Sequence, residues 1–365
     1  MKVGIILAPF GEARPSGLSA YVLNLTLELL RQNTNWQFLI CIKGVYDTSV
    51  FDGYENMTIQ NFPNSFLWKD IAAFQNRDVD IWLYNNPNMP LLFKPKRSIV
   101  TALDFGAFYP DEELGIKERI NRLVSKLLQY DALRSTSQVV CTSYATKNDV
   151  HTFFPSIEEK KVSVAMCGFT RICEKYTPAS IENLPADYYL LVGVIKPRKN
   201  QLTVVEAFIE AKKKGLKSKL VICGKGSNEY FATVMETVNN SDCKDDIIYF
   251  GYCTNEELVT LFIHARALVF PSHVEGFGMP IVEAMSCGTP VICSSNGALG
   301  EVAEGYALTV DSRDTKGFGN AMLTLEDDSI RDSYIAKGKI RASEFSWEKS
   351  AQTYAQTMRA VCREN

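Results

Sequence analysis

The sequence is poor in the residues that bind metals and nucleic acids. Only three histidines occur in 365 residues, His151, His264 and His273, and their spacing matches no metal-ligand pattern. The formal net charge of -3 lacks the basic excess that a nucleic-acid-binding surface normally needs. No apolar run is long enough to span a membrane as a helix. We therefore expect no metal site, no nucleic-acid partner and no transmembrane segment.

Cysteine pairing motifs are also missing. The ten cysteines are scattered without a Cys-x-x-Cys pair, and several stand in apolar runs: Cys41, Cys141, Cys223 and Cys293. Cysteine in such a setting acts as a small hydrophobic residue, and disulfides are rare in the cytosol. The N-terminal apolar stretch spans only about six residues, too short for a signal peptide, and suits a first strand better. These features predict a cytosolic protein with reduced, buried thiols.

The chain does contain a regular alternation of short apolar strands and amphipathic helices. With 365 residues, two domains are expected, and the alternation predicts α/β domains with doubly wound parallel sheets. The expected strands are 3–8, 36–42, 80–84, 99–103, 138–142, 162–165, 188–194, 219–223, 247–250, 267–270 and 290–294. The expected helices are 18–31, 117–134, 144–154, 202–214, 229–239, 255–265, 280–285 and several beyond them. Residues 173–187 hold two prolines and no periodicity, so they form the expected linker.

The most distinctive motif is FPSHVEGFGMPIVEAM at 270–285. A buried strand is followed by a Gly-rich turn and a short helix, which Pro280 opens. Such a turn exposes backbone N–H groups at a helix N-terminus, where the positive dipole end attracts phosphate. Glu275 and Glu283, with seven residues between them, suit the hydroxyl groups of a ribose or a sugar. The motif therefore indicates a nucleotide-sugar site.

This motif resembles the donor-site signature of retaining GT-B glycosyltransferases of the family-4 type. EGFGMPIVEAMSCGTPVI, GALGEVAEGYALTVD, VGVIKPRKNQ, SGLSAYVLNLTLELL and FSWEKSAQTYAQTM carry the resemblance, which is weak only from about 43 to 95. It implies two Rossmann-like domains whose sheets face a cleft. Residues 1–177 would form the acceptor-side domain, and residues 188–346 the donor domain. The last segment, 347–365, would cross back to the first domain.

A basic pair follows the strand at 188–194. Arg198 and Lys199 could neutralise a diphosphate, and arginine could bind it bidentately. A solvated basic loop is the alternative. The resemblance assigns this pair, together with Gly193, to the donor phosphates. The chain departs from many relatives at Val194, where they carry a further arginine.

The resemblance also assigns roles to the turn and helix of the distinctive motif. Glu283 would accept hydrogen bonds from the ribose, and Glu275 would contact the donor sugar. The intervening turn would offer backbone N–H groups and comprises Gly276, Phe277, Gly278 and Met279. An exposed helix carboxylate and a helix N-terminal charge are the alternatives for the two glutamates.

Three further segments enter the site by the same resemblance. The turn at Ser16 and Gly17 would approach the donor phosphate, although Ser16 could serve only as a helix N-cap. Lys225 and Cys253 would flank the base. Asp104 follows Leu103, where relatives often have histidine. Either Asp104 takes over the polar contact of that histidine, or the enzyme does without it.

The resemblance implies a retaining, metal-independent transfer of a hexosyl unit, with mannose favoured, to a glycan or lipid-linked sugar hydroxyl. Glu275, Arg198, Lys199 and Asp104 would be the catalytic residues. No cofactor is expected, and GDP-mannose is favoured as the donor. A nucleotide-sugar 2-epimerase stays open, although the scarcity of histidine counts against it. A catalytically degenerate nucleotide-sugar-binding subunit also stays open because of Leu103.

The helix expected at 117–134 carries basic residues over an apolar stripe. Its basic residues are Lys117, Arg119, Arg122, Lys126 and Arg134, and its apolar ones are Ile116, Ile120, Leu123, Leu127 and Leu128. Most such helices pack on a core. Peripheral contact with an anionic membrane at its inner face is the alternative.

Overall fold

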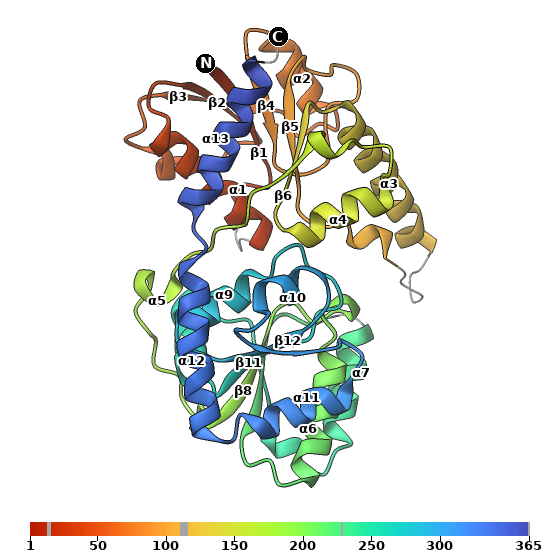
Figure 1. Ribbon diagram of the computed structural model, residues 1–365, viewed down its shortest axis with the longest axis vertical. Coiled ribbons are helices and arrows are strands. Elements are labelled where there is room, and N and C mark those ends of the chain that lie inside the picture. Colours follow the sequence, from red (N-terminus) through yellow and green to blue (C-terminus); the bar gives the residue numbers. More distant parts are fainter. Residues whose placement is uncertain (13–15, 110–115, 228, 364–365) are drawn as a thin grey trace. The chain divides into compact units, whose positions relative to one another are not determined.

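The computed structural model describes residues 1–12, 16–109, 116–227 and 229–363, with side chains at 116–118 left out. The chain folds into two compact units, Met1–Gly168 with Ser346–Asn365, and Phe169–Phe345. Each unit contains one parallel sheet flanked by helices (Figure 1). The predicted α/β class with two Rossmann-like domains is confirmed. Within the described ranges, no helix combines the length and hydropathy of a membrane span.

The first unit is built on a seven-stranded sheet with the order β3-β2-β1-β4-β5-β6-β7. Its strands are β1 (Lys2–Leu7), β2 (Gln37–Lys43), β3 (Met57–Phe62), β4 (Ile81–Tyr84), β5 (Ser98–Ala102), β6 (Gln138–Cys141) and β7 (Val162–Val164). Every pairing is parallel. The edge strand β3 was not predicted, because most of its side chains are only partly buried and give no apolar run.

The helices of the first unit include the last helix of the chain. They are α1 (Gly17–Gln32), α2 (Trp68–Gln75), α3 (Ile116–Ser135), α4 (Tyr144–Phe153) and α13 (Trp347–Arg363). The buried hydroxyl of Tyr354 on α13 lies 2.9 Å from that of Tyr21 on α1 and 2.7 Å from that of Thr101 on β5. The predicted return of the C-terminal helix to the first domain is thus confirmed.

The second unit has a six-stranded parallel sheet with the order β10-β9-β8-β11-β12-β13. Its strands are β8 (Tyr188–Val192), β9 (Lys219–Cys223), β10 (Ile247–Gly251), β11 (Ala267–Phe270), β12 (Val291–Ser294) and β13 (Leu308–Val310). Its helices are α5 (Ile172–Lys175), α6 (Gln201–Lys213), α7 (Glu229–Asn239), α8 (Asn255–His264), α9 (Met279–Ser286), α10 (Gly297–Ala303), α11 (Thr315–Thr324) and α12 (Asp328–Ser343). Buried side chains of α6, α7 and α11 pack on one face of this sheet, among them Phe208, Val234 and Phe318.

The boundary between the units lies earlier than the sequence suggested. Residues 169–177, which we had placed in the first domain, belong to the second unit. Ile172 is buried on α5, and α5 contacts α8. A disulfide joins Cys173 to Cys287 at the end of α9. The expectation of reduced thiols is therefore wrong for this pair, because two cysteines 114 residues apart show no pairing pattern in the sequence.

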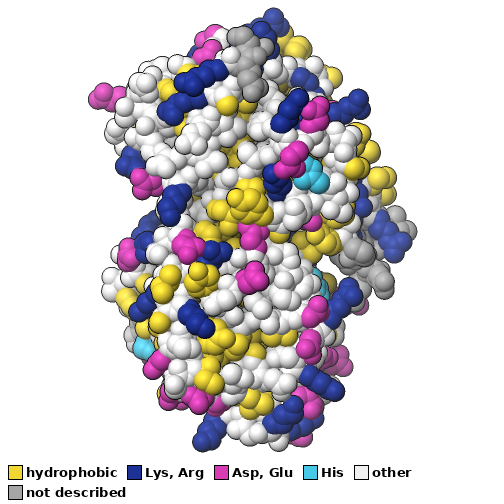
Figure 2. Space-filling view, viewed as in Figure 1, with side chains coloured by type: hydrophobic (Ala, Val, Ile, Leu, Met, Phe, Trp, Pro, Cys, Tyr) yellow, Lys and Arg dark blue, Asp and Glu magenta, His cyan; other side chains and the backbone are white. Residues whose placement is uncertain are grey.

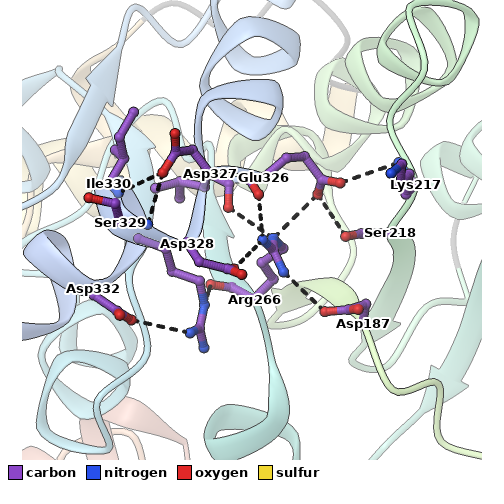
Figure 3. A network of polar contacts seen from close by, with 12 residues as sticks. Asp187, Lys217, Ser218, Arg266, Glu326, Asp327, Asp328, Ser329, Ile330 and Asp332 are labelled. Atoms are coloured by element: carbon purple, nitrogen blue, oxygen red, sulfur yellow. Dashed lines mark hydrogen bonds and ion pairs between the residues drawn. The ribbon is translucent and has the colours of Figure 1, made fainter.

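A polar network closes the amino-terminal edge of the second sheet around Arg266, which precedes β11 (Figure 3). The mostly buried guanidinium donates to the carbonyl oxygens of Leu325 and Glu326 at 2.8 and 2.7 Å. It also contacts the carboxylates of Asp328 at 2.7 Å and Asp187 at 3.1 Å. These contacts fix the connection between α11 and α12 against the start of β8 and β11.

Candidate active site

The second unit brings most of the predicted site residues to the carboxyl edge of its sheet. Four neighbouring strands, β10, β9, β8 and β11, end there. The loops that follow them, together with the short helix α9, carry the candidates. These are Gly193, Arg198, Lys199, Lys225, Cys253, Glu275, Gly276, Phe277, Gly278, Met279 and Glu283. The carboxyl edge of parallel strands is where α/β sheets bind ligands.

Backbone contacts hold these loops to one another. The amide of Gly193 donates to the carbonyl oxygen of Cys223 at 2.9 Å, and the amide of Gly224 donates to that of Gly251 at 2.7 Å. Gly224 has φ +153°, and a Cβ there would lie 1.9 Å from the carbonyl oxygen of Gly193. Only glycine therefore allows the loops after β8 and β9 to approach this closely.

Lys199 and Glu275 form an ion pair inside the candidate site. Lys199 lies on η4 (Pro197–Lys199), and its Nζ is 2.5 Å from Oε1 of Glu275. Only 17% and 12% of the two side chains are exposed. The ammonium also lies 5.0 Å from the ring centroid of Phe270. The sequence analysis places Lys199 at the donor phosphates and Glu275 at the donor sugar. It does not indicate that the two side chains neutralise and orient each other.

Glu283 lies in the middle of the short helix α9. Burial raises the pKa of its carboxyl group to about 7. No side chain or amide of the described residues donates a hydrogen bond to it. The side chain is only partly shielded from water, and it gains no donor from the described residues in exchange, which disfavours its charged form. Hydroxyl groups of a bound ligand would supply the missing donors.

The N-terminus of α9 begins at a glycine. Gly278 occupies the N-cap position with φ 95°, and no side chain caps the helix. A Cβ on Gly278 would approach Leu299 to 2.5 Å. The predicted opening of the helix at Pro280 is correct to within one residue. This end of α9 therefore offers backbone donors and a positive dipole end of the kind that attracts anions.

The sequence analysis did not predict a second polar cluster at the site, which consists of Ser272 and the hydrogen-bonded residues Asn200, His273 and Ser312. Asn200, in the left-handed region with φ 58°, donates from its amide to the carbonyl oxygens of Pro271 and Ser312 at 3.2 and 2.6 Å. His273 Nδ1 lies 3.0 Å from the hydroxyl of Ser312, and burial lowers the pKa of His273. Ser272 is buried, and its hydroxyl has no partner among the described atoms. The PRKN sequence was noted, but only for its cations.

A backbone hydrogen bond also links the loop after β8 to the loop after β11. The amide of His273 donates to the carbonyl oxygen of Arg198 at 3.0 Å. Arg198 itself is only partly exposed on η4. The loop after β8 and the loop after β11 therefore form one surface.

The remaining predicted residues belong to the first unit. Ser16 is the N-cap of α1, and its hydroxyl accepts from the amide of Ser19 at 3.2 Å in a capping box. Gly17 begins that helix; residues 13–15 of the predicted turn lie outside the described residues. Asp104 follows β5, and its carboxylate accepts from the amide of Gly106 at 2.9 Å. It lies close enough to Asp149 to help raise the pKa of that carboxyl, although burial is the larger cause.

Solved structures with this fold include proteins described as glycosyltransferases. Sucrose-phosphate synthase from Thermosynechococcus elongatus superposes with a TM-score of 0.75 at 19% identity, covering 100% of both chains. HepE of Anabaena, in complex with UDP-glucose, gives 0.72 at 15% identity and covers 99% of this chain and 100% of its own. At these identities the likeness establishes the fold, which is GT-B.

Sequence comparison gives the family. Residues 174–341 match the profile of the glycosyl transferases group 1. O-antigen chain mannosyltransferase B from Escherichia coli is 30% identical over 288 residues, which cover 76% of this chain and 74% of that protein. O-antigen chain mannosyltransferase RfbU from Salmonella typhimurium is 28% identical over 333 residues, 85% and 89% of the two chains. The chain belongs to the group 1 glycosyl transferases and is a glycosyltransferase.

Proposed function

We propose that this protein transfers a mannosyl unit from a nucleotide diphosphate sugar to a sugar hydroxyl of a glycan or lipid-linked acceptor. Its similarity to two O-antigen chain mannosyltransferases supports the sugar. Solved neighbours that contain UDP or UDP-glucose support a nucleotide-sugar donor. GDP-mannose is the donor we favour.

The observation that carries the proposal is the environment of Glu283. This half-buried carboxyl has a raised pKa of about 7, lies on the helix whose N-terminus is uncapped by any side chain, and shares the carboxyl edge with Arg198 and the Lys199–Glu275 pair. Glu283 lies within two turns of the N-terminus of α9. A ribose bound at Glu283 would therefore place the diphosphate near that N-terminus. The sugar would then lie toward Glu275.

The proposed chemistry is a retaining displacement in which charge develops on the departing diphosphate. The bond from C1 of the sugar to the diphosphate oxygen breaks, and the acceptor oxygen bonds to C1 on the face that the diphosphate vacates. The acceptor proton passes to the leaving phosphate. Arg198, Lys199 and the α9 amides would stabilise the leaving group, so the proposal requires no metal ion. Glu275 would orient the sugar.

The proposal also includes three residues of the first unit, Asp104, Ser16 and Gly17. Asp104 would contact the donor sugar where many relatives use the preceding histidine. Ser16 would act chiefly by capping α1, so we expect Ser16→Ala to affect stability more than transfer.

A donor panel tests the proposal. Thermal unfolding with GDP-mannose, GDP-glucose, UDP-glucose and UDP-N-acetylglucosamine should give the largest shift with GDP-mannose. A ligand at 100 times its Kd stabilises by about 2.7 kcal/mol, which corresponds to a Tm shift of roughly 5–10 °C for a unit of this size. Transfer to a mannose-bearing acceptor should follow the same order. Absence of any shift with all four would contradict the proposal.

The alternatives separate in the same assay. A 2-epimerase would convert UDP-N-acetylglucosamine to its epimer without an acceptor. A degenerate binding subunit would bind GDP-mannose yet neither transfer nor hydrolyse it. The comparisons do not favour either alternative, because the relatives named above are transferases.

We also propose peripheral membrane contact through α3. Five exposed apolar side chains lie along this helix, between 44% and 62% exposed: Ile120, Leu123, Val124, Leu127 and Tyr130. Their spacing places them on one face. Leu91, Leu92 and Phe93 are also exposed, and Lys94 pairs with Asp131 of α3. Apolar and basic side chains are visible at the surface where α3 lies (Figure 2).

The basic residues of α3 suit an anionic bilayer. Arg119 and Arg134 are exposed on this helix, and such a combination of apolar face and cations binds membrane surfaces. Co-sedimentation with phosphatidylglycerol vesicles should be lost in Leu123→Ser/Leu127→Ser. Ile340→Ser is a matched control, because Ile340 is 60% exposed on α12 of the other unit. Equal sedimentation of all three proteins would refute membrane contact through α3.

A further inference from the structure

Two free cysteines meet at the carboxyl edge of the second sheet. Cys223 is the last residue of β9, and Cys253 lies in the turn after β10. The strands are neighbours, with Cys223 opposite Gly251. The two Sγ atoms are 2.9 Å apart. A disulfide requires a separation of about 2.05 Å, so the sulfur atoms need to approach by only about 0.9 Å.

The two thiols are chemically unequal. The Cys223 thiol donates a hydrogen bond to the Cys253 sulfur, which lowers the pKa of Cys253 and raises that of Cys223. Glu257 is the carboxylate near both, and it opposes ionisation. Cys253 is partly exposed, whereas Cys223 is buried. Since the thiolate is the nucleophile in thiol–disulfide exchange, Cys253 is the residue suited to react first.

The other thiols at strand positions lack these properties. Cys41, Cys141 and Cys293 are buried, and burial raises the pKa of each. Cys243 and Cys362 are partly buried. Cys223 and Cys253 are in direct thiol–thiol contact.

We propose that Cys223 and Cys253 are a site of reversible thiol oxidation, in which a low-molecular-weight disulfide such as oxidised glutathione closes a bond between them. The Cys253 thiolate attacks one sulfur of the reagent, forms a mixed disulfide and releases one glutathione thiolate. The Cys223 thiol loses its proton and attacks the Cys253 sulfur, which releases the second glutathione. The protein loses two electrons and two protons in total, and the reagent is reduced to two thiols.

Oxidation at this site would act on the donor turn. Cys253 belongs to the turn that we place beside the base, and this consequence rests on the proposed function. A bond from Cys253 to the end of β9 would fix that turn. A nucleotide bound against this turn would also shield Cys253 from oxidised glutathione. The donor nucleotide should therefore slow the oxidation.

The experiment follows the thiols by intact mass and peptide mapping. After treatment with oxidised glutathione, the wild-type protein should lose the mass of two hydrogen atoms and yield a peptide cross-linked between Cys223 and Cys253. Cys223→Ser should stop at the mixed disulfide on Cys253. Cys253→Ser should react at least tenfold more slowly, and Cys243→Ser should behave like the wild type. Peptide mapping distinguishes the new bond from the Cys173–Cys287 disulfide.

Two results would overturn the thiol site. One is a wild-type protein that keeps a stable mixed disulfide on Cys253, and the other is a protein whose thiols at both positions survive treatment. The nucleotide arm tests the donor placement separately. A cross-link that forms at the same rate with and without saturating GDP-mannose would leave the thiol site standing and remove the base from this turn.

Discussion

The Lys199–Glu275 ion pair allows a structural role to be separated from a catalytic one. Removing one partner of a fully buried pair costs about 3–5 kcal/mol, because the other charge stays unpaired. An exposed pair contributes only about 0–1 kcal/mol. The side chains here are 17% and 12% exposed, nearer the buried limit. We therefore expect Lys199→Met to lower the unfolding free energy of the second unit by about 2–3 kcal/mol.

The double variant Lys199→Met/Glu275→Gln should recover a large part of that stability, because no uncompensated charge remains. A coupling energy of about 1–2 kcal/mol is expected for residues in contact. Transfer activity should stay at least a hundredfold below the wild type in Lys199→Met, in the single variant Glu275→Gln and in the double variant, since electrostatic stabilisation of the leaving group is lost. The rescue therefore appears in stability and not in catalysis.

The assay has to report on the second unit. All four tryptophans, Trp36, Trp68, Trp82 and Trp347, lie in the first unit, so their fluorescence is unsuitable. Hydrogen exchange of peptides from β8 and β11 follows the correct unit. Lys213→Met is the matched control, because Lys213 pairs with Glu210 at 2.6 Å while both side chains stay about 60% exposed. Additive losses in the double variant, or transfer restored to it, would refute this account of the pair.

Three further predictions concern other parts of the second unit. The pKa of Glu283 is raised by burial from 4.5 to about 7; the folded state therefore holds the proton more tightly, and stability falls as pH rises from about 4.5 to 7. Glu283→Gln should remove this fall and stabilise the ligand-free protein above pH 7 by roughly 2 kcal/mol, which is less than the roughly 3 kcal/mol that the raised pKa alone would give, because the side chain is only partly buried; pH-dependent denaturation can show this. Gly224→Ala should destabilise the second unit by several kcal/mol more than Gly215→Ala, because Gly215 also has a positive φ but a Cβ there would meet no atom within 4 Å. Equal losses of stability, measured by hydrogen exchange, would contradict this steric argument. Arg266→Met should cost about 3 kcal/mol of stability yet leave kcat at saturating donor unchanged, because Arg266 lies at the opposite edge of the sheet; a large loss of kcat in the folded variant would contradict that placement.

Much of the fold could be predicted because the central strands are continuous apolar runs. Runs such as 188–192 and 267–270 are buried along almost their whole length, and their alternation with amphipathic helices specifies a parallel sheet. The edge strand β3 and the short strand β13 escaped prediction, because partly exposed strands lack that pattern. The unit boundary was displaced for another reason. The segment after 168 has no periodicity, and burial of Ile172 with the Cys173–Cys287 disulfide holds it to the second unit.

The candidate site could be predicted where its residues are close in sequence. Residues 275–283 form a local turn and helix, so the sequence motif alone was enough to predict them. Contacts across long separations could not be predicted, as between Lys199 and Glu275, Asn200 and Ser312, or Cys223 and Cys253. They depend on the order of strands in the sheet, which brings the loops after β8, β9, β10 and β11 to one edge.

The most direct test of the donor site is calorimetry with two forms of one nucleotide. GDP and its 2′,3′-dideoxy analogue should differ in affinity for the wild-type protein by tenfold or more, because a hydrogen bond to a charged group contributes about 1.5–3 kcal/mol. In Glu283→Ala this difference should vanish while GDP still binds through its diphosphate. Equal affinities in the wild type, or discrimination that survives in Glu283→Ala, would contradict a ribose at Glu283.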